Sequence, residues 1–584
     1  MNYRNLCIVF LISFTFCCMT ASAMLGGRTF FSTRSQSVNA ALELVGWEKE
    51  VNQPVQTTCY GTAALAIEYN HSFDTERITK FLFGSECLFF SGSKVMNRGP
   101  HDILADYFGL PFCFQSCVSF HPVISNTIFD LNWYQSLDCI ACGTYLRVHV
   151  PLVHTKWDLN LEETVLDYGD NFSICGTYTF YPGGYMSPEK ITRAHMHTNV
   201  REAFEGIRSV GDLQPLHFGR IFGRQTKTRI AEIQVAVGYN PLLSDWYHLG
   251  GEIRVAAPTG NRPEAEFLFE AIVGNCHHWE LGAGLTGHVD VWESCNKCHT
   301  IALYLDANIT HLFADRQNRS YDLKTGPGSR YMLAEVFGNG STNLEVGAVG
   351  GPSAEYQYIG CIQPVVNVTT LPTDISIAVQ GDVVLKCAYQ RSDGFECDIG
   401  YNFWGRSKEK ADCRCRLARD QYVLKGDAQV YGFEPTFEEL PVRLSVSQSE
   451  ATLHKAQGQG NFVPGVEFRN ENADSPALAF DGSGAPLNQV TAADAFALQI
   501  TQGQINTSNP PIFLSDDDIN PHSALLPRAF TNKLFFYVGS AWHCVEKLKP
   551  YVGIGGSAEW AHTNARNNSG YSQAHIWIKG GFSY

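Results

Sequence analysis

The sequence ends with SQAHIWIKGGFSY, residues 572–584, in which apolar and polar side chains alternate. One set of alternate positions is apolar and ends on an aromatic residue: Ala574, Ile576, Ile578, Gly580, Phe582 and Tyr584. The positions between them are mostly polar: Gln573, His575, Trp577, Lys579 and Ser583. Because successive side chains of a strand point to opposite faces, this pattern predicts a β-strand with one apolar and one polar face.

The same two-faced pattern recurs along the chain. Six clean repeats lie at residues 230–239, 247–257, 279–291, 299–310, 375–389 and 548–562. Less regular repeats lie at 58–73, 113–120, 127–135, 142–156, 329–337, 355–365, 396–404 and 533–542. Strands of soluble proteins commonly have about five or six residues, whereas a tilted strand needs about 9–11 to cross a bilayer. The sequence therefore predicts an all-β fold, a transmembrane antiparallel β-barrel of about 14–16 strands.

Both ends of the chain fit an exported barrel. Residues 1–23 have a positive start, an apolar run and a small-residue cleavage site, which predicts a secretory signal peptide. Residues 24–50 are expected to form an N-terminal helical segment, because Val38, Ala41, Leu42 and Val45 have helical spacing. This segment could plug the lumen, or it could pack below the barrel. The barrel is expected over 51–584, with a large loop or insert at about 406–526.

The connections alternate between short turns and long loops, as in bacterial outer-membrane barrels. The C-terminal strand, with its terminal aromatic residue, resembles the closing strand of that class. We expect Ile576, Ile578 and Phe582 to face lipid and Tyr584 to lie at the periplasmic edge. The partner strand should be the first one, near residues 58–73, because a closed barrel leaves no free edge. Interfacial aromatic girdles are expected at strand ends from Trp133, Trp157, Trp246, Trp279, Trp292, Trp542 and Trp560.

Charge and cysteine content narrow the possible partners. The net charge of −15 argues against nucleic-acid binding. Of the 19 cysteines, sixteen follow the signal peptide, and disulfides are expected in an exported protein. Zinc at the pairs Cys139–Cys142, Cys295–Cys298 and Cys413–Cys415 is a less favoured alternative. Outer-membrane lipid and small solutes are the expected partners, self-association is left open, and no cofactor or metal is expected.

The polar faces of the strands supply the candidate site. If the apolar face meets lipid, the other face lines the lumen. The predicted pore-lining residues are Arg147, His149, Glu232, Gln234, Glu252, Arg254, Glu280, His288, Asp290, Asp306, Asp382, Lys386, Lys549 and Glu559. A mixed-charge interior suits a water-filled or partly plugged pore. The competing interpretation is that these groups pair with each other and only stiffen the wall.

No convincing Ser–His–Asp set, HExxH motif or nucleophile elbow is present, so no enzymatic activity is expected. The predicted function is an outer-membrane pore, a porin, for passive diffusion of small hydrophilic solutes. A plugged barrel that moves a hydrophobic ligand is the first alternative. A soluble, disulfide-rich extracellular β-protein that binds partners through its loops is the second.

Three segments carry a family resemblance. Residues 26–32 (GGRTFFS), 148–159 (VHVPLVHTKWDL) and 257–263 (APTGNRP) resemble recurring pieces of large outer-membrane proteins from intracellular bacteria living in protists. The cysteine content is similar to that of the chlamydial major outer-membrane porins. The N-terminal segment followed by a barrel resembles, in architecture only, the long-chain fatty-acid transporters. These resemblances imply a porin-like protein of the bacterial outer membrane and transfer no catalytic or ligand residues.

Overall fold

The computed structural model describes residues 27–47, 50–54, 60–92, 95, 98–111, 113–170, 195–296, 298–337, 358–412, 416–419, 421–424, 431–433, 441–443, 452–454, 479–480, 486–487, 513–542, 548–561 and 565–584. The expected signal peptide lies outside these residues, and so does most of the segment 406–526. Among the described residues, no helix is long and apolar enough to cross a membrane.

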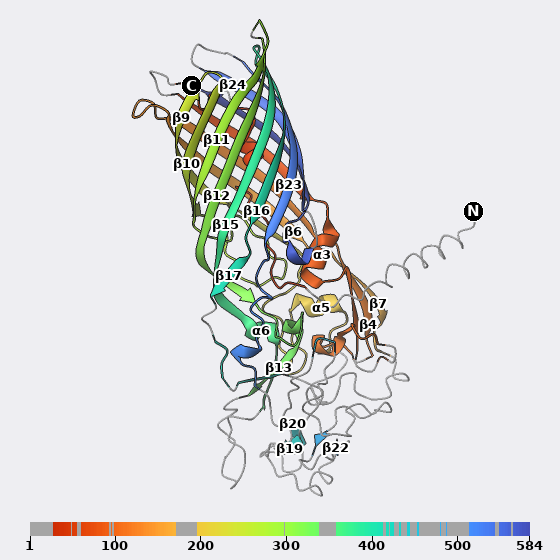
Figure 1. The fold of residues 1–584 in the computed structure, drawn as a ribbon. Helices are drawn as coiled ribbons and strands as arrows, with labels where there is room; N and C mark the ends of the chain where they lie inside the picture. The colour runs from red at the N-terminus through yellow and green to blue at the C-terminus, as the bar shows by residue number, and fades with distance from the viewer. Residues whose placement is uncertain are drawn as a thin grey trace, which may run out of the picture.

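Twelve antiparallel strands form a closed barrel (Figure 1). In chain order they are β1 (Gly61–Ser72), β5 (Val123–Ser136), β6 (Thr144–Asp158), β9 (Glu232–Ser244), β10 (Tyr247–Pro258), β11 (Glu280–Glu293), β12 (His299–Ser320), β15 (Thr370–Arg391), β16 (Phe395–Arg406), β23 (Ala529–Ala541), β24 (Lys549–Ala561) and β25 (Gln573–Ser583). The last strand pairs with the first, as predicted, with Ile578 opposite Ile67. The all-β antiparallel barrel is confirmed.

The predicted count of 14–16 strands is wrong, because three alternating stretches do not enter the ring. Residues 113–120 contain β4 (Gln115–Phe120), 329–337 contain β13 (Leu333–Phe337), and 355–365 contain β14 (Tyr358–Pro364), all in small separate sheets. Each of these strands has only five to seven residues. Two further strands, β8 (Arg224–Ile230) and β17 (Glu409–Asp412), attach to β6 and β15 outside the ring.

The outward face of the barrel is apolar. On β25, Ile576, Ile578 and Phe582 are 55%, 54% and 44% exposed, while Trp577 and Lys579 between them are buried. Within the described chain, no Asp, Glu, Lys or Arg occupies an outward position in the middle of the twelve strands. Five of the tryptophans expected in girdles are exposed: Trp133, Trp246, Trp279, Trp292 and Trp542.

Two features of the predicted faces are wrong. Ile375 and Ile377 share the alternating apolar face of residues 375–389 with Val379, which predicts that they point outward. They are buried instead, because the register between β12 and β15 shifts near Thr310–Asp315 and exchanges the two faces of β15 there. Trp157 is fully buried, and its ring lies 4.9 Å from that of Phe269, so it is a core residue and not part of a girdle.

The long connections fold into a cap at one end of the barrel, opposite the C-terminus (Figure 1). Its helical elements are α3 (Thr75–Phe83), η2 (Ala105–Phe108), α5 (Val200–Glu205), η5 (Ser329–Tyr331), α6 (Val365–Thr369), η7 (Asp516–Asp518) and η8 (Ala565–Asn567). Its strands, besides β4, β13 and β14, are β2 (Cys87–Ser91), β3 (Ile103–Leu104), β7 (Leu161–Asp167) and β18 (Tyr422–Leu424). Four short strands complete the description: β19 (Tyr431–Phe433), β20 (Pro441–Arg443), β21 (Ala479–Phe480) and β22 (Pro486–Leu487). A large apolar core joins the cap to the barrel rim.

The chain before β1 lies in the barrel. Its residues from Thr29 to Trp47 are almost all buried, and the one helix in this stretch, α2 (Ala40–Leu44), is shorter than the helical spacing predicts. An eight-stranded barrel is filled by its own side chains, whereas 16–18 strands leave a channel. A 12-stranded barrel falls between these sizes, and here additional polypeptide fills the remaining space.

Candidate functional site: the plugged lumen

The N-terminal segment, residues 27–54, which we call the plug, runs from the cap to the opposite end of the barrel. At the cap, the Arg28 amide donates to the Phe81 carbonyl at 2.9 Å. The Phe31 ring packs among the rings of Phe81 and Trp157, at 5.6 and 5.7 Å. At the far end, the Gln53 amide donates to the Tyr60 hydroxyl at 2.8 Å. The plug therefore spans the whole lumen.

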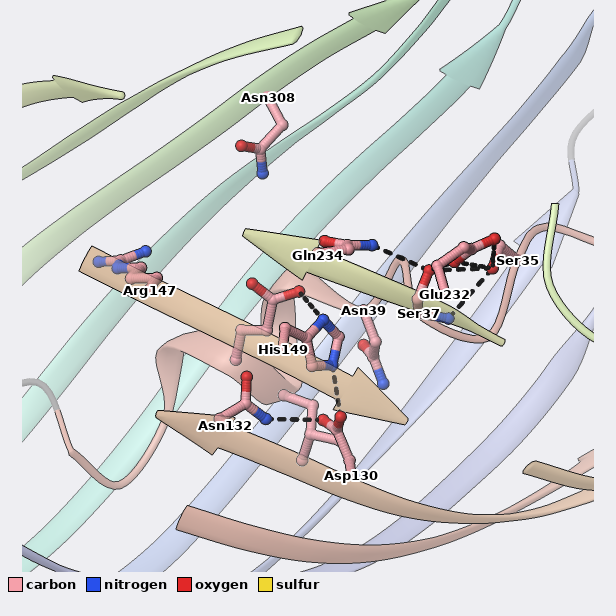
Figure 2. Close-up of polar contacts among 12 residues, drawn as sticks. Ser35, Ser37, Asn39, Asp130, Asn132, Arg147, His149, Glu232, Gln234 and Asn308 are labelled. Carbon is pink, nitrogen blue, oxygen red and sulfur yellow. Dashed lines mark hydrogen bonds and ion pairs between the residues drawn. The ribbon is translucent and has the colours of Figure 1, made fainter. Parts of the chain in front are cut away.

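The first polar contact in the lumen joins two serines of the plug to β9. The Ser35 hydroxyl donates to the two carboxylate oxygens of Glu232 at 2.9 and 2.8 Å, and the Ser37 hydroxyl also bonds Glu232. The Gln234 amide donates to the Ser37 hydroxyl at 2.9 Å (Figure 2). Glu232 is fully buried, so these hydroxyls replace the water that its carboxyl group would otherwise bind.

A second group of contacts involves the opposite wall. Arg34 forms an ion pair with Glu559 at 3.1 Å, and Lys533 lies 3.5 Å from the same carboxylate. The Asn39 side chain donates to Glu68 at 2.8 Å and accepts from Lys533 at 3.0 Å. These groups are all buried, and the plug supplies the cation that pairs with Glu559 and the neutral amide that bonds Glu68 and Lys533.

The helix α2 packs on small and aromatic wall residues. Its buried face contacts a cluster that includes Ala66, Ala302, Ala388, Tyr537 and Trp577. The wall also uses glycine where an aromatic ring lies flat against it: a Cβ at Gly555 would lie 2.5 Å from the Trp577 indole nitrogen. Small wall residues thus make room for α2 in the lumen.

Glu43 of α2 contacts two wall cations. Its carboxylate lies 3.6 Å from both His149 and Arg254. His149 also bonds Asp130, and Figure 2 shows its ring between the two acidic groups. Arg254 in turn pairs with Glu252 at 3.1 Å. The helix is therefore anchored through a chain of alternating charges that continues around the wall.

Two wall lysines bind the C-terminal carbonyls of α2. The Lys579 ammonium donates to the carbonyls of Leu42 and Glu43 at 2.9 and 3.0 Å, and Lys386 donates to that of Leu44 at 3.3 Å. Cations are favourable at this end of a helix, where carbonyl groups lack partners within the helix. Lys579 also lies 4.5 Å from the centre of the Trp47 ring.

Beyond α2 the lumen widens into a vestibule at the short-turn end of the barrel. This cavity has a volume of about 550 Å³. Its lining contains five carboxylate residues, Glu50, Asp245, Asp290, Asp393 and Glu396, and two basic residues, Arg391 and Lys549. The two small cavities beside α2 measure only about 20 and 10 Å³. Each is close to the minimum that holds one water.

All fourteen predicted pore-lining side chains lie on the inner faces of the barrel strands, and Lys549, at the short-turn end, is the most exposed of them. Glu232, Gln234, Arg254, His149, Lys386, Lys549 and Glu559 contact the plug directly. Arg147, Glu252 and Asp306 form a wall network, with Arg147 at 4.0 and 3.8 Å from the two carboxylates. Of the remainder, His288 and Asp290 lie at the vestibule, Glu280 bonds Asn275, and Asp382 bonds Asn308. Whether the set lines a conducting pore stays a prediction.

Sequence reasoning missed the plug's own polar residues and four wall partners: Glu68, Asp130, Lys533 and Lys579. The wall partners lie on the polar faces of strands that were recognised, so strand alternation was a usable signal for them. The run Ser32–Asn39 is polar but buried, and its sequence has no pattern that reports burial.

Seven described cysteines are free thiols: Cys142, Cys276, Cys295, Cys298, Cys361, Cys387 and Cys397. The pairs Cys139–Cys142 and Cys295–Cys298 are therefore not bridged within themselves, and Cys413–Cys415 lies outside the described residues. Cys276 lies in the loop that follows β10, and its sulfur is 3.3 Å from the Ser32 hydroxyl. Burial raises the pKa of this thiol to about 11. The other expected bridges stay a prediction.

No protein-family model matches the sequence, and no curated protein matches it. Among solved structures, the chain is similar to an outer membrane channel from Pseudomonas putida F1, with 10% identity, coverage of 91% of this chain and 98% of that chain, and a TM-score of 0.30. A Pseudomonas aeruginosa FadL homologue has 5% identity, 96% and 99% coverage, and a TM-score of 0.26. The Pseudomonas putida toluene transporter TodX has 7% identity, 96% and 95% coverage, and a TM-score of 0.26. Such low identities transfer no function.

Proposed function

We propose that this protein is an outer-membrane channel for small hydrophilic solutes whose lumen is closed by its own plug, and which conducts when the plug moves. The observation that carries the proposal is the polar lumen crossed from end to end by residues 27–54. A lumen meant only to be filled needs no buried charges, because apolar packing of the same volume is often as stable. Charged wall groups that bind the plug can bind water and solutes once it leaves.

The outward face supports insertion in a membrane. A closed barrel satisfies every backbone hydrogen bond between its strands, which is what a bilayer requires. Monomeric soluble proteins rarely expose an apolar patch larger than about 300–600 Å². Here the outward positions at the centres of the twelve strands carry no Asp, Glu, Lys or Arg, and tryptophans such as Trp133 and Trp246 lie near strand ends. With the C-terminus periplasmic, the cap faces the exterior, which is consistent with export through the expected signal peptide.

The vestibule supports a hydrophilic solute over a hydrophobic ligand. The vestibule is lined by five carboxylate residues and two basic residues. An apolar molecule that entered it would displace the water bound to these charged groups, which costs free energy. The excess of acidic groups favours cations among the solutes that enter. A hydrophobic-ligand transporter and a soluble loop-binding protein stay the two alternative predictions.

A charge placed on the outward face tests the membrane environment. Ile578 lies opposite Ile67 and Ile554 at mid-strand and is 54% exposed. In a bilayer, Ile578→Arg should lower the free energy of unfolding by about 2–4 kcal/mol. In water, an exposed Ile→Arg change alters the free energy of unfolding by no more than about 0.5 kcal/mol. The measurement is the urea midpoint in lipid vesicles, read from the heat-modifiable gel band.

The matched control is Ile140→Arg, in the turn between β5 and β6, where the side chain is 79% exposed. This variant should unfold within about 0.5 kcal/mol of the unchanged protein. Equal midpoints for the two variants, or a protein that remains in solution without detergent and shows no heat-modifiable band, would contradict membrane insertion.

A further inference from the structure

A second large cavity lies outside the lumen, at the cap-side rim of the barrel. It has a volume of about 1150 Å³ and lies where β16 ends, beside β17 and the chain that leads into β23. Two outward-facing side chains, Val379 of β15 and Phe530 of β23, form part of its wall. The cavity, which we call the rim site, is therefore continuous with the apolar outer face of the barrel.

The lining of the rim site is strongly basic. It includes Arg28, Arg406, Lys408, Lys410 and Arg528. Glu409 is the one carboxylate residue among the described residues of the lining, and Arg319 already binds it at 3.1 and 3.3 Å. Within the described part of the chain, Lys408, Lys410 and Arg528 form no ion pair with a carboxylate. Among the described residues, Lys408, Lys410 and Arg528 thus give the rim site three positive charges without a paired carboxylate.

Arg406 adds a buried guanidinium to the wall of the rim site. The residue is only 7% exposed, and one of its terminal nitrogens bonds the Ser569 hydroxyl at 3.4 Å. Its Nε has no hydrogen-bond partner in the described structure. A buried N–H group without an acceptor is unfavourable, and a guanidinium is the group best suited to bind a phosphate through two parallel hydrogen bonds. The guanidinium of Arg406 lines the cavity, so its positive charge adds to that of the exposed lysines.

We propose that the rim site binds the phosphate headgroup of an anionic amphiphile from the surrounding leaflet. The phosphate lies against Arg406, Lys408, Lys410 and Arg528, and the apolar chain lies along Val379 and Phe530. This inference rests on the proposed membrane insertion of the barrel. A free phosphate has the same headgroup chemistry, but it gives no role to the apolar part of the wall.

The test compares lipid binding by folded barrels in neutral detergent, measured by native mass spectrometry. The probes are phosphatidic acid, the neutral lipid phosphatidylcholine, and glycerol 3-phosphate as the soluble headgroup. The rim variant is Lys408→Ala/Lys410→Ala, two exposed residues. The matched control, Lys156→Ala/Lys227→Ala, removes two lysines from β6 and β8.

Each basic group near a membrane surface contributes about fivefold to binding of an anionic lipid, so the rim variant should bind phosphatidic acid roughly 25-fold more weakly. The control variant should bind it as the unchanged protein does. Equal weakening in both variants, or equal binding of the two lipids, would overturn the proposal. If glycerol 3-phosphate binds as tightly as phosphatidic acid, the ligand is a soluble anion, and the proposal of an amphiphile is wrong.

Heat-modifiable mobility is measured on the same samples. If the unchanged protein keeps its heat-modifiable mobility but does not bind phosphatidic acid, only the rim-site proposal fails. Absence of heat-modifiable mobility in the unchanged protein concerns the proposed function instead, so the two failures are distinguishable. A second variant, Arg406→Gln, should weaken phosphatidic acid binding while keeping that mobility, and unchanged binding there would contradict the role given to the buried guanidinium.

Discussion

Replacing Arg319 by methionine should lower the free energy of unfolding by about 3–5 kcal/mol, because it leaves a buried carboxylate without its cation. Arg319, near the cap end of β12, is fully buried and contacts both carboxylate oxygens of Glu409. Its guanidinium also lies 3.4 Å from the centre of the Phe30 ring of the plug and donates to the Ala524 carbonyl at 3.1 Å. One side chain therefore joins the plug, the barrel wall and the cap.

Arg262 provides the matched control for this change. It also contacts both oxygens of one carboxylate, that of Asp315, at 2.9 Å each. Its side chain is 52% exposed, and exposed pairs contribute about 0–1 kcal/mol. Urea unfolding in lipid vesicles should separate Arg319→Met from Arg262→Met by about 2 kcal/mol or more. Equal midpoints would contradict the assignment of Arg319 as the buried link.

Replacing Lys579 by methionine should loosen the plug without unfolding the barrel. The change removes the donor to the carbonyls of Leu42 and Glu43, which are then buried without a partner. Each such loss costs about 1–3 kcal/mol, and about 2 kcal/mol corresponds to roughly 30-fold more frequent opening. Hydrogen exchange of the amides in α2 should accelerate by that factor, because exchange reports local opening.

Lys549→Met is the control for the lysine change. Lys549 also contacts the plug, at 3.5 Å from Glu50, but its side chain is 42% exposed. Exposed ion pairs are weak, so exchange in α2 should rise less than about fivefold. If Lys579→Met and Lys549→Met accelerate exchange equally, the buried ammonium does not hold the helix.

The barrel could be predicted because strand alternation is local. Residues 572–584 show both their faces and their role as the last strand, and the partner near 58–73 follows from closure alone. The strand count was wrong because 113–120 and 355–365 alternate too, although they are short and pair within the cap. Alternation shows that the two faces of a strand have different surroundings, but it does not show which element packs against either face.

The plug contacts could not be predicted for the same reason. The polar face of β9 identifies Glu232 as inward, but only the fold brings Ser35 and Ser37 to it, almost two hundred residues away in the chain. The exchanged faces at Ile375 and Ile377 depend on the register with β12, which is also a tertiary property. The inward residues were identified as a set, and their shared partner within the chain was not.

Single-channel recording of a barrel lacking residues 27–54 tests the central claim most directly. The unchanged protein should be mostly silent in a planar bilayer, with brief openings. The deletion variant, folded by its heat-modifiable mobility, should show sustained conductance steps with a preference for cations. A synthetic peptide of residues 27–54 should suppress these steps when it is added to the short-turn side. A folded deletion variant that stays silent, or an unchanged protein that conducts equally, would contradict closure of the lumen by the plug.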